Sequence, residues 1–157
     1  MKKILFGITS LTLGGAEKVL VDLANELSKK YDITILTIYA KGEFEKKLNS
    51  KVKLKSIYDF QFNDMSNFKK KLTALKLLLF KKRFYKKYIK GDYDIEIAFL
   101  EGPITRLFGV KNKNTRKIAW VHNDITLVFG KDIKAKLKVS IDLSLIHISE
   151  PTRLGMI

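Results

Sequence analysis

Residues 3–39 read KILFGITSLTLGGAEKVLVDLANELSKKYDITILTIY, and their pattern predicts two strands joined by a helix. Residues 3–9 form a nearly continuous apolar run, which predicts a strand buried on both faces of a sheet. Polar and glycine residues at 10–15 end that strand. Apolar side chains then recur at helical spacing from residue 16 until two lysines near residue 30. Residues 32–39 are rich in Ile and Thr and predict a second strand.

Strand, glycine turn, helix and strand make a βαβ unit, whose crossover is almost always right-handed. Further strands are predicted at 52–57, 93–100 and 117–121, and helices at 67–89 and 103–108. Strands that alternate with helices indicate an open parallel sheet covered on both sides. The predicted fold class is therefore α/β, a Rossmann-like open parallel sheet with helices on both faces.

The composition limits the classes of function. The chain has 157 residues, enough for one domain with a sizeable core. It has no cysteine and two histidines, which excludes a disulfide scaffold and the usual zinc ligand sets, so no metal or other cofactor is expected. The N-terminal apolar run is too short for a signal peptide, and no window reaches the roughly 18 apolar residues of a membrane span. We therefore expect a cytoplasmic protein.

The formal net charge of +15 attracts nucleic acid, anionic membranes and phosphorylated ligands. Residues 69–90 hold ten Lys and Arg and no acid. In a helix over 67–89, the side chains expected to face the sheet are Leu72, Leu75, Leu79 and Phe80. The cations expected to contact the inner face of a membrane are Lys81, Lys82, Arg83, Lys86 and Lys87. A solvated helix face explains the same pattern equally well.

Ligands of open parallel sheets bind beyond the carboxyl ends of the strands. Three segments of this sequence fall there, namely residues 11–17, 101–102 and 122–124. They are far apart in the sequence, but the predicted topology brings them to one edge of the sheet. This convergence is the main indication of a site that the residues themselves give.

Gly14 and Gly15 stand between the first strand and the first helix. Glycines there let the backbone approach a ligand closely, and a helix start offers unpaired N–H groups and a positive dipole end to phosphate. A tight turn that needs glycine for its conformation explains the pair equally well. The loop is neither a G-x-G-x-x-G dinucleotide fingerprint nor a P-loop, and no acid ends the second strand.

Three segments in the same order resemble the N-terminal domain of family 4 glycosyltransferases: ITSLTLGGAEKVLVDLANELSKKYDITILT (8–37), FLEGP (99–103) and KIAWVHND (117–124). The resemblance covers residues 1–140. It implies a GT-B fold, in which two Rossmann-like domains face each other and the N-terminal one mainly holds the acceptor. It also implies a nucleotide-sugar donor, a polysaccharide or lipid-linked acceptor, and transfer with retention of anomeric configuration, usually without a metal.

The resemblance also implies roles for residues at the carboxyl edge. Gly14 and Gly15 would approach the donor diphosphate through backbone N–H groups, and His122 would act as the catalytic residue that contacts the transferred sugar. The residues that would contact the acceptor or the sugar are Glu101, Asn123 and Asp124. Without the resemblance, a lone histidine such as His122 is more often a loop or capping residue, and Glu101 could equally cap the helix that follows.

The lysine-rich texture of the chain ends near Asp142. Residues 142–157 look like translated sequencing-adaptor sequence, so we expect a native domain over 1–141 and a non-native tail over 142–157. The paired-glutamate motif of the second GT-B domain does not occur in the chain. We therefore expect a truncated transferase that is inactive without its C-terminal domain. The alternative function is a basic single-domain module that binds nucleic acid or anionic surfaces.

Overall fold

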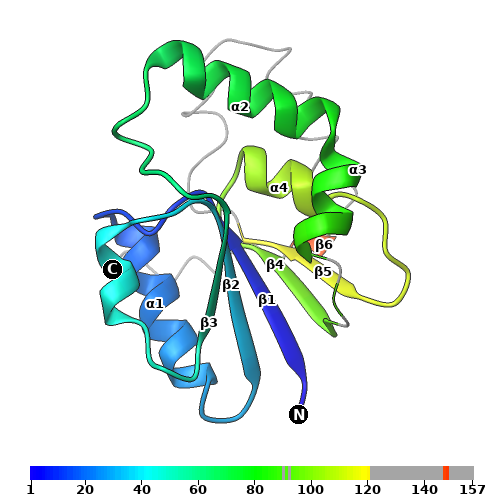
Figure 1. The fold of residues 1–157 in the computed structure, drawn as a ribbon. Helices are drawn as coiled ribbons and strands as arrows, with labels where there is room; N and C mark the ends of the chain where they lie inside the picture. Colours follow the sequence, from blue (N-terminus) through cyan, green and yellow to red (C-terminus); the bar gives the residue numbers. More distant parts are fainter. Residues whose placement is uncertain (90, 92, 121–146, 149–157) are drawn as a thin grey trace, which may run out of the picture.

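The structure, a computed structural model, describes residues 1–89, 91, 93–120 and 147–148. Its parallel sheet has the strand order β3-β2-β1-β4-β5-β6 (Figure 1). The strands are β1 (Lys3–Ile8), β2 (Asp32–Tyr39), β3 (Lys53–Tyr58), β4 (Ile95–Ala98), β5 (Arg116–Ala119) and β6 (His147–Ile148). The helices are α1 (Gly15–Leu27), α2 (Asn67–Leu79), α3 (Lys81–Phe84) and α4 (Pro103–Phe108), with a 3-10 turn η1 (Glu43–Lys47) and a π-turn η2 (Tyr85–Ile89). The predicted Rossmann-like α/β fold is confirmed.

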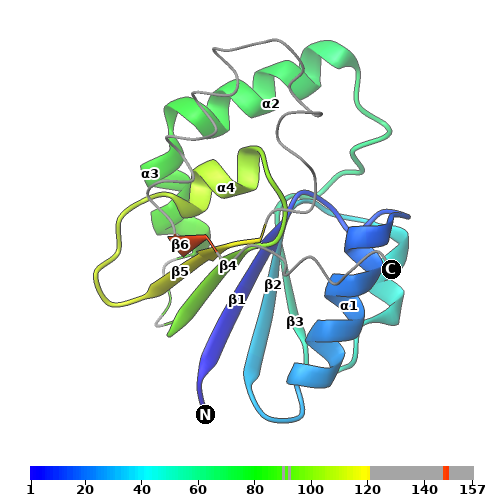
Figure 2. The same ribbon diagram turned by 180° about the vertical axis from the view of Figure 1, so that it is seen from behind.

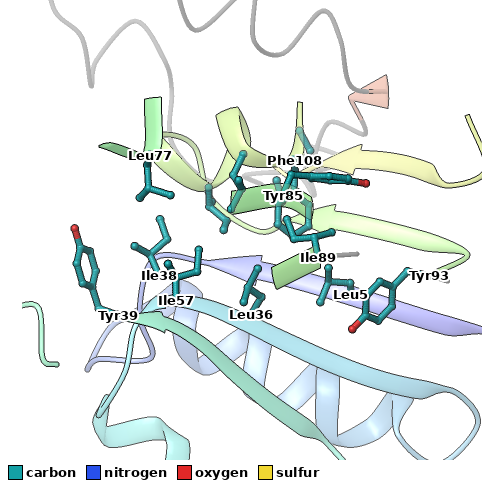
Figure 3. Packing of buried hydrophobic residues seen from close by; sticks show 14 of the residues in the cluster. Leu5, Leu36, Ile38, Tyr39, Ile57, Leu77, Tyr85, Ile89, Tyr93 and Phe108 are labelled. Atoms are coloured by element: carbon teal, nitrogen blue, oxygen red, sulfur yellow. The ribbon is translucent and has the colours of Figure 1, made fainter. Parts of the chain in front are cut away.

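Helices cover both faces of the sheet (Figures 1 and 2). Successive side chains of a strand point to opposite faces. Ile4, Phe6 and Ile8 of β1 therefore join the core under α1, while Leu5 joins the core on the other face. The second core takes its helical side chains from α2, η2 and α4, and includes Leu77, Tyr85, Ile89, Ile104 and Phe108 (Figure 3). Burial on both faces explains the continuous apolar sequence of β1.

The packing of α4 on β1 depends on Gly7. A Cβ atom at this position would overlap the Phe108 ring and would lie 2.8 Å from Ile104 Cγ1. Both side chains are buried, so neither can move aside without opening the core. The glycine therefore lets α4, which begins just after the carboxyl end of β4, lie directly on the sheet.

The predicted continuous helix over 67–89 is wrong. α2 ends at Leu79, Phe80 has φ −109° and ψ 24°, and α3 and η2 follow in a new direction (Figure 1). The break brings Tyr85 and Ile89 into the core against the sheet. Burial of these two side chains outweighs the helix propensity that favours one straight helix.

The predicted inward face of this helix is also wrong. The side chains expected to face the sheet are exposed: Leu72, Leu75, Leu79 and Phe80. Thr73 and Leu77 are buried instead, with Thr73 Oγ1 2.9 Å from Tyr39 Oη and Leu77 within the core. Helical periodicity locates an apolar stripe along a helix, but it does not tell which side meets the sheet.

β6 extends the sheet beyond β5, with His147 in register with Ile118 and Ile148 in register with Ala119. Both residues of β6 belong to the segment that we predict to be a non-native tail. The domain boundaries, 1–141 and 142–157, stay predictions.

Candidate functional site

The carboxyl edge of the sheet has a switch point between β1 and β4, its central strands. From β1 the chain enters α1 on one face, and from β4 it enters α4 on the other (Figures 1 and 2). The loops at 9–14 and 99–102 leave the sheet as neighbours, since Phe99 N donates to Gly7 O at 2.7 Å. In open α/β sheets, ligands bind where two such loops diverge.

The loop that follows β1 is hydrogen-bonded to the end of β2 and to η1. Thr9 O accepts hydrogen bonds from the N–H groups of Ile38 and Tyr39 at 3.1 and 3.0 Å, and Leu11 O accepts one from Phe44 N at 2.9 Å. Gly42 lies so close that a Cβ atom there would overlap the Leu11 backbone. The backbone that leads to Gly14 is therefore held in place from one side.

Gly14 and Gly15 form the start of α1 without a conformational need for glycine. Gly14 is extended, with φ −165° and ψ 163°, and neither residue has a positive φ. A Cβ atom on Gly15 would meet nothing within 4 Å, and the three atoms nearest to one on Gly14 belong to the flexible Glu17 carboxylate. The tight-turn explanation of the pair loses its basis. Gly15 is exposed, and the first N–H groups of α1 have no intrahelical partner.

The Glu17 carboxylate lies against this helix start. It belongs to the first turn of α1, where an acid complements the positive end of the helix dipole. A phosphate bound to the same N–H groups would be repelled by this carboxylate. An anion could bind at the start of α1 only if the Glu17 side chain turned away from it.

Glu101 and Gly102 leave β4 at the same edge. Gly102 has φ 113° and ψ −139°, which residues with a side chain rarely adopt, although the place of a Cβ atom is empty. Thr105 Oγ1 donates to Leu100 O at 2.6 Å and fixes the turn into α4. Glu101 is half-buried beside this turn, so the structure brings it to the edge that holds Gly14.

His122, Asn123 and Asp124 lie outside the described residues, and their roles stay predictions. Trp120, two residues before His122, is described. Trp120 N donates to Ala98 O at 2.8 Å, and its ring centroid lies 5.0 Å from that of Phe99. The segment after β5 therefore runs beside the end of β4 and reaches the carboxyl edge at Trp120.

The five cations predicted to contact a membrane differ in exposure and surroundings. Lys81 is half-buried, whereas Lys82, Arg83, Lys86 and Lys87 are exposed. Arg83 and Lys87 line a cavity of about 250 Å³ at the junction of α2 and α3. Lys86 lines a different cavity, of about 590 Å³, beside η2. Their membrane contact stays a prediction. Within the described ranges no helix is long and apolar enough to cross a bilayer.

A buried polar cluster lies between η2 and the strands β4 and β5. We call it the Glu96 cluster, and it consists of Tyr85, Glu96, Asn112 and Lys117. Glu96 Oε2 lies 2.5 Å from Lys117 Nζ, and Glu96 Oε1 accepts a hydrogen bond from Tyr85 Oη at 2.6 Å. Tyr85 Oη also accepts from Lys117 Nζ at 3.1 Å and from Asn112 Nδ2 at 3.3 Å. These bonds tie η2 to the middle of β4 and β5.

Burial sets the protonation of this cluster. It raises the pKa of the Tyr85 hydroxyl above 10.0, and the hydrogen bond and charge of Glu96 raise it further. Burial also lowers the pKa of the Lys117 amine from 10.5, against the opposing effect of the Glu96 carboxylate. The sequence analysis did not predict this cluster. Glu96, an acid within the apolar run 93–100, could have indicated it.

The cavity of about 590 Å³ lies at the amino ends of β4 and β5. Tyr85, Tyr93, Asp94, Asn112 and Thr115 are among its lining residues. It therefore opens at the other end of the strands from Gly14 and Glu101. No sequence motif predicted it, because its shape depends on how η2 packs beside the strands.

The fold and its carboxyl edge are those of the Rossmann-like α/β class, whose members bind ligands at this switch point. Over 106 residues the chain is 37% identical to the GalNAc-alpha-(1->4)-GalNAc-alpha-(1->3)-diNAcBac-PP-undecaprenol alpha-1,4-N-acetyl-D-galactosaminyltransferase of Campylobacter jejuni subsp. jejuni serotype O:2. The match covers 64% of this chain, which spans 26% of that relative's length. The chain is thus related to a glycosyltransferase. No protein-family model matches it.

Proposed function

We propose that the chain is the N-terminal, acceptor-side domain of a GT-B glycosyltransferase of family 4. The observation that carries the proposal is the helix start at Gly14 and Gly15. It lies at the switch point of the sheet, a Cβ atom on Gly15 would meet nothing within 4 Å, and nothing in its conformation requires glycine. Two glycines there are explained by a ligand that approaches the backbone closely.

The chemistry of this edge suits the departure of a nucleoside diphosphate. As the glycosidic bond to the donor breaks, negative charge grows on the leaving diphosphate. The N–H groups and the positive dipole end of α1 stabilise that charge without a metal. In this proposal His122 contacts the transferred sugar, and Glu101, Asn123 and Asp124 contact the sugar or the acceptor. Transfer with retention of anomeric configuration belongs to the same proposal.

The name of the relative suggests the acceptor. That enzyme is named for a glycan joined through PP to undecaprenol. We propose a lipid-linked or growing polysaccharide acceptor for this chain as well, with a nucleotide sugar as donor, and work at the inner face of a membrane. We further propose that transfer needs a second, facing domain, so that the chain alone binds ligand without turning it over.

Equilibrium dialysis against nucleoside diphosphates and their sugars tests this proposal. Saturable binding is expected, and the Gly15→Ala variant should bind about tenfold more weakly, because its methyl group stands where the ligand approaches. The basic-module alternative predicts another outcome. An oligonucleotide would then bind with a steep salt dependence, and nucleotide sugars would have no effect.

A further inference from the structure

The cavity of about 590 Å³ at the amino ends of β4 and β5, which we call the amino-end cavity, has the size of a small-molecule site. Asn112 and Asn114 line it with amides that both donate and accept hydrogen bonds, and Asp94 lines it with a carboxylate that accepts them. The buried Tyr93 also lines the cavity, and a Cβ atom on the neighbouring Gly91 would lie 2.8 Å from its ring atom Cε2. A few convergent polar groups beside an aromatic side chain are typical of a site for a small organic ligand.

Hydrogen bonds hold the polar groups of this cavity in place. Asn112 Nδ2 donates to Tyr85 Oη at 3.3 Å and to Thr115 Oγ1 at 2.9 Å. Asn112 Oδ1 accepts a hydrogen bond from Asn114 N at 3.2 Å. Tyr85 is itself anchored in the Glu96 cluster. A ligand therefore meets a wall that is already ordered, which lowers the entropic cost of binding.

The charges of the wall indicate a neutral ligand. Among the lining residues that the structure describes, Lys86 is the cation and Asp94 is the acid, so the two charges balance. Asp94 Oδ2 accepts a hydrogen bond from Lys3 N at 2.7 Å, which keeps the carboxylate at the cavity. A phosphate or carboxylate ligand would be repelled by Asp94. With a net charge of +15, the chain offers anions stronger attraction elsewhere on its surface.

We propose that the amino-end cavity binds one pyranose unit of a neutral sugar. Each sugar hydroxyl both donates and accepts, so a pyranose can bond to the amides of Asn112 and Asn114 and to the Asp94 carboxylate. The C–H groups on one face of a pyranose ring are weakly positive and pack well against the negative face of an aromatic ring such as that of Tyr93. A neutral ligand with many hydroxyls thus matches both the polar and the aromatic parts of the wall.

This site is independent of the proposed function, because it lies at the opposite end of the strands. Gly14 and Glu101 follow the carboxyl ends of β1 and β4, whereas Asp94 and Thr115 precede the amino ends of β4 and β5. The 4 residues of β4 alone span about 13 Å. A single sugar unit is shorter than this and cannot contact both ends at once.

An NMR titration of the ¹⁵N-labelled chain with methyl glycosides tests the proposal. The probes are the methyl α-pyranosides of glucose, galactose and their 2-acetamido-2-deoxy forms. At least one of them should cause saturable shifts of the Asn112 and Asn114 side-chain amides. The amide of Asn63, an exposed asparagine in the loop after β3, should stay unmoved. Because the ligand is neutral, its affinity should be the same at low and at high salt.

A matched pair of asparagine variants then tests the assignment of the site. Asn114→Ala should weaken sugar binding by about tenfold, since it removes an amide that both donates and accepts. The variant keeps the backbone N–H group that bonds to Asn112 Oδ1, so the loop should keep its shape. Asn63→Ala removes an amide that is also exposed, and it should leave sugar binding unchanged.

The proposal fails if none of these glycosides moves the Asn112 and Asn114 amides, or if Asn114→Ala binds sugar as tightly as the wild type. It also fails if uridine or inorganic phosphate shifts these amides while the glycosides do not. Glycoside shifts confined to Gly14 and Gly102 would overturn this inference and leave the proposed function standing. Sugar binding at Asn114 without any nucleotide-sugar binding at Gly14 would overturn the proposed function alone.

Discussion

Glu96 and Lys117 face each other in register on β4 and β5, with Oε2 and Nζ 2.5 Å apart and side chains 0% and 9% exposed. Removal of two charges from water costs free energy that their attraction returns only with good geometry and further hydrogen bonds. Tyr85 Oη supplies these bonds, since it donates to the carboxylate and accepts from the amine. The two strands that lead to the carboxyl edge are therefore coupled to η2.

Removal of one partner of this pair should be far more costly than removal of both. Glu96→Gln or Lys117→Met alone should lower the free energy of unfolding by about 3–5 kcal/mol, because the remaining group stays buried without its counter-charge. Glu96→Leu combined with Lys117→Met should recover most of that loss. Urea denaturation of the single and double variants measures the coupling. Simply additive losses would contradict a coupled pair.

The raised pKa of Tyr85 predicts a loss of stability at alkaline pH. The folded protein keeps the Tyr85 proton at a pH above 10.0 at which the unfolded chain has lost it, so stability falls as pH rises there. The lowered pKa of Lys117 acts oppositely, but only up to 10.5, where the unfolded chain also loses that proton. Above pH 10.5 the Tyr85→Phe variant should lose stability less steeply than the wild type, by up to about 1.4 kcal/mol per pH unit. Equal slopes in urea titrations would refute this assignment.

Substitutions of two glycines, Gly7 and Gly15, should have opposite effects on stability. Gly7→Ala should cost about 1–3 kcal/mol of unfolding free energy, because the added methyl group overlaps the Phe108 ring. Gly15→Ala should leave stability unchanged or raise it by up to ~1 kcal/mol, because its Cβ meets nothing and alanine favours a helix. Thermal and urea unfolding check both variants. A destabilised Gly15→Ala protein would mean that this glycine serves the fold.

Gly102 should be intolerant of any side chain for a conformational reason. With φ at 113° and ψ at −139°, Gly102→Ala should cost about 1–3 kcal/mol of stability although the surrounding space is free. The same change should shift the NMR signal of the neighbouring Glu101 amide, since the turn into α4 must adjust. If Gly102→Ala had the stability of the wild type and an unchanged Glu101 amide signal, the turn would accommodate the side chain without strain.

Local pattern was enough to predict most of the sheet. β2 has the predicted bounds, Asp32–Tyr39, and α4 has the predicted bounds, Pro103–Phe108. These elements follow from apolar runs, β-branched residues and a proline at the first helical turn, all of which are local. The topology that brings Gly14 and Glu101 to one edge followed from the order of the elements.

The failures arose where long-range contacts decide. The helix breaks at Phe80, and the segment after the break brings Tyr85 to Glu96, a contact that no helical period reveals. Leu72, Leu75 and Leu79 of α2 were predicted to face the sheet, but they are exposed. Thr73 and Leu77 are buried instead. The sequence also left the role of Gly14 and Gly15 open, and only their φ angles and surroundings removed the tight-turn explanation.

Residue-resolved NMR of the ¹⁵N-labelled chain would show whether a nucleotide sugar binds at the switch point of the sheet. During titration with nucleoside diphosphate sugars, we expect saturable shifts of the Gly14, Gly15 and Gly102 amides at the switch point. In Gly15→Ala, the Gly14 and Gly102 shifts should need about tenfold more ligand. Unmoved glycine amides at saturating ligand would contradict a nucleotide-sugar site at this edge. So would shifts confined to the lysines of α2 and α3 that sulfate or an oligonucleotide reproduces equally.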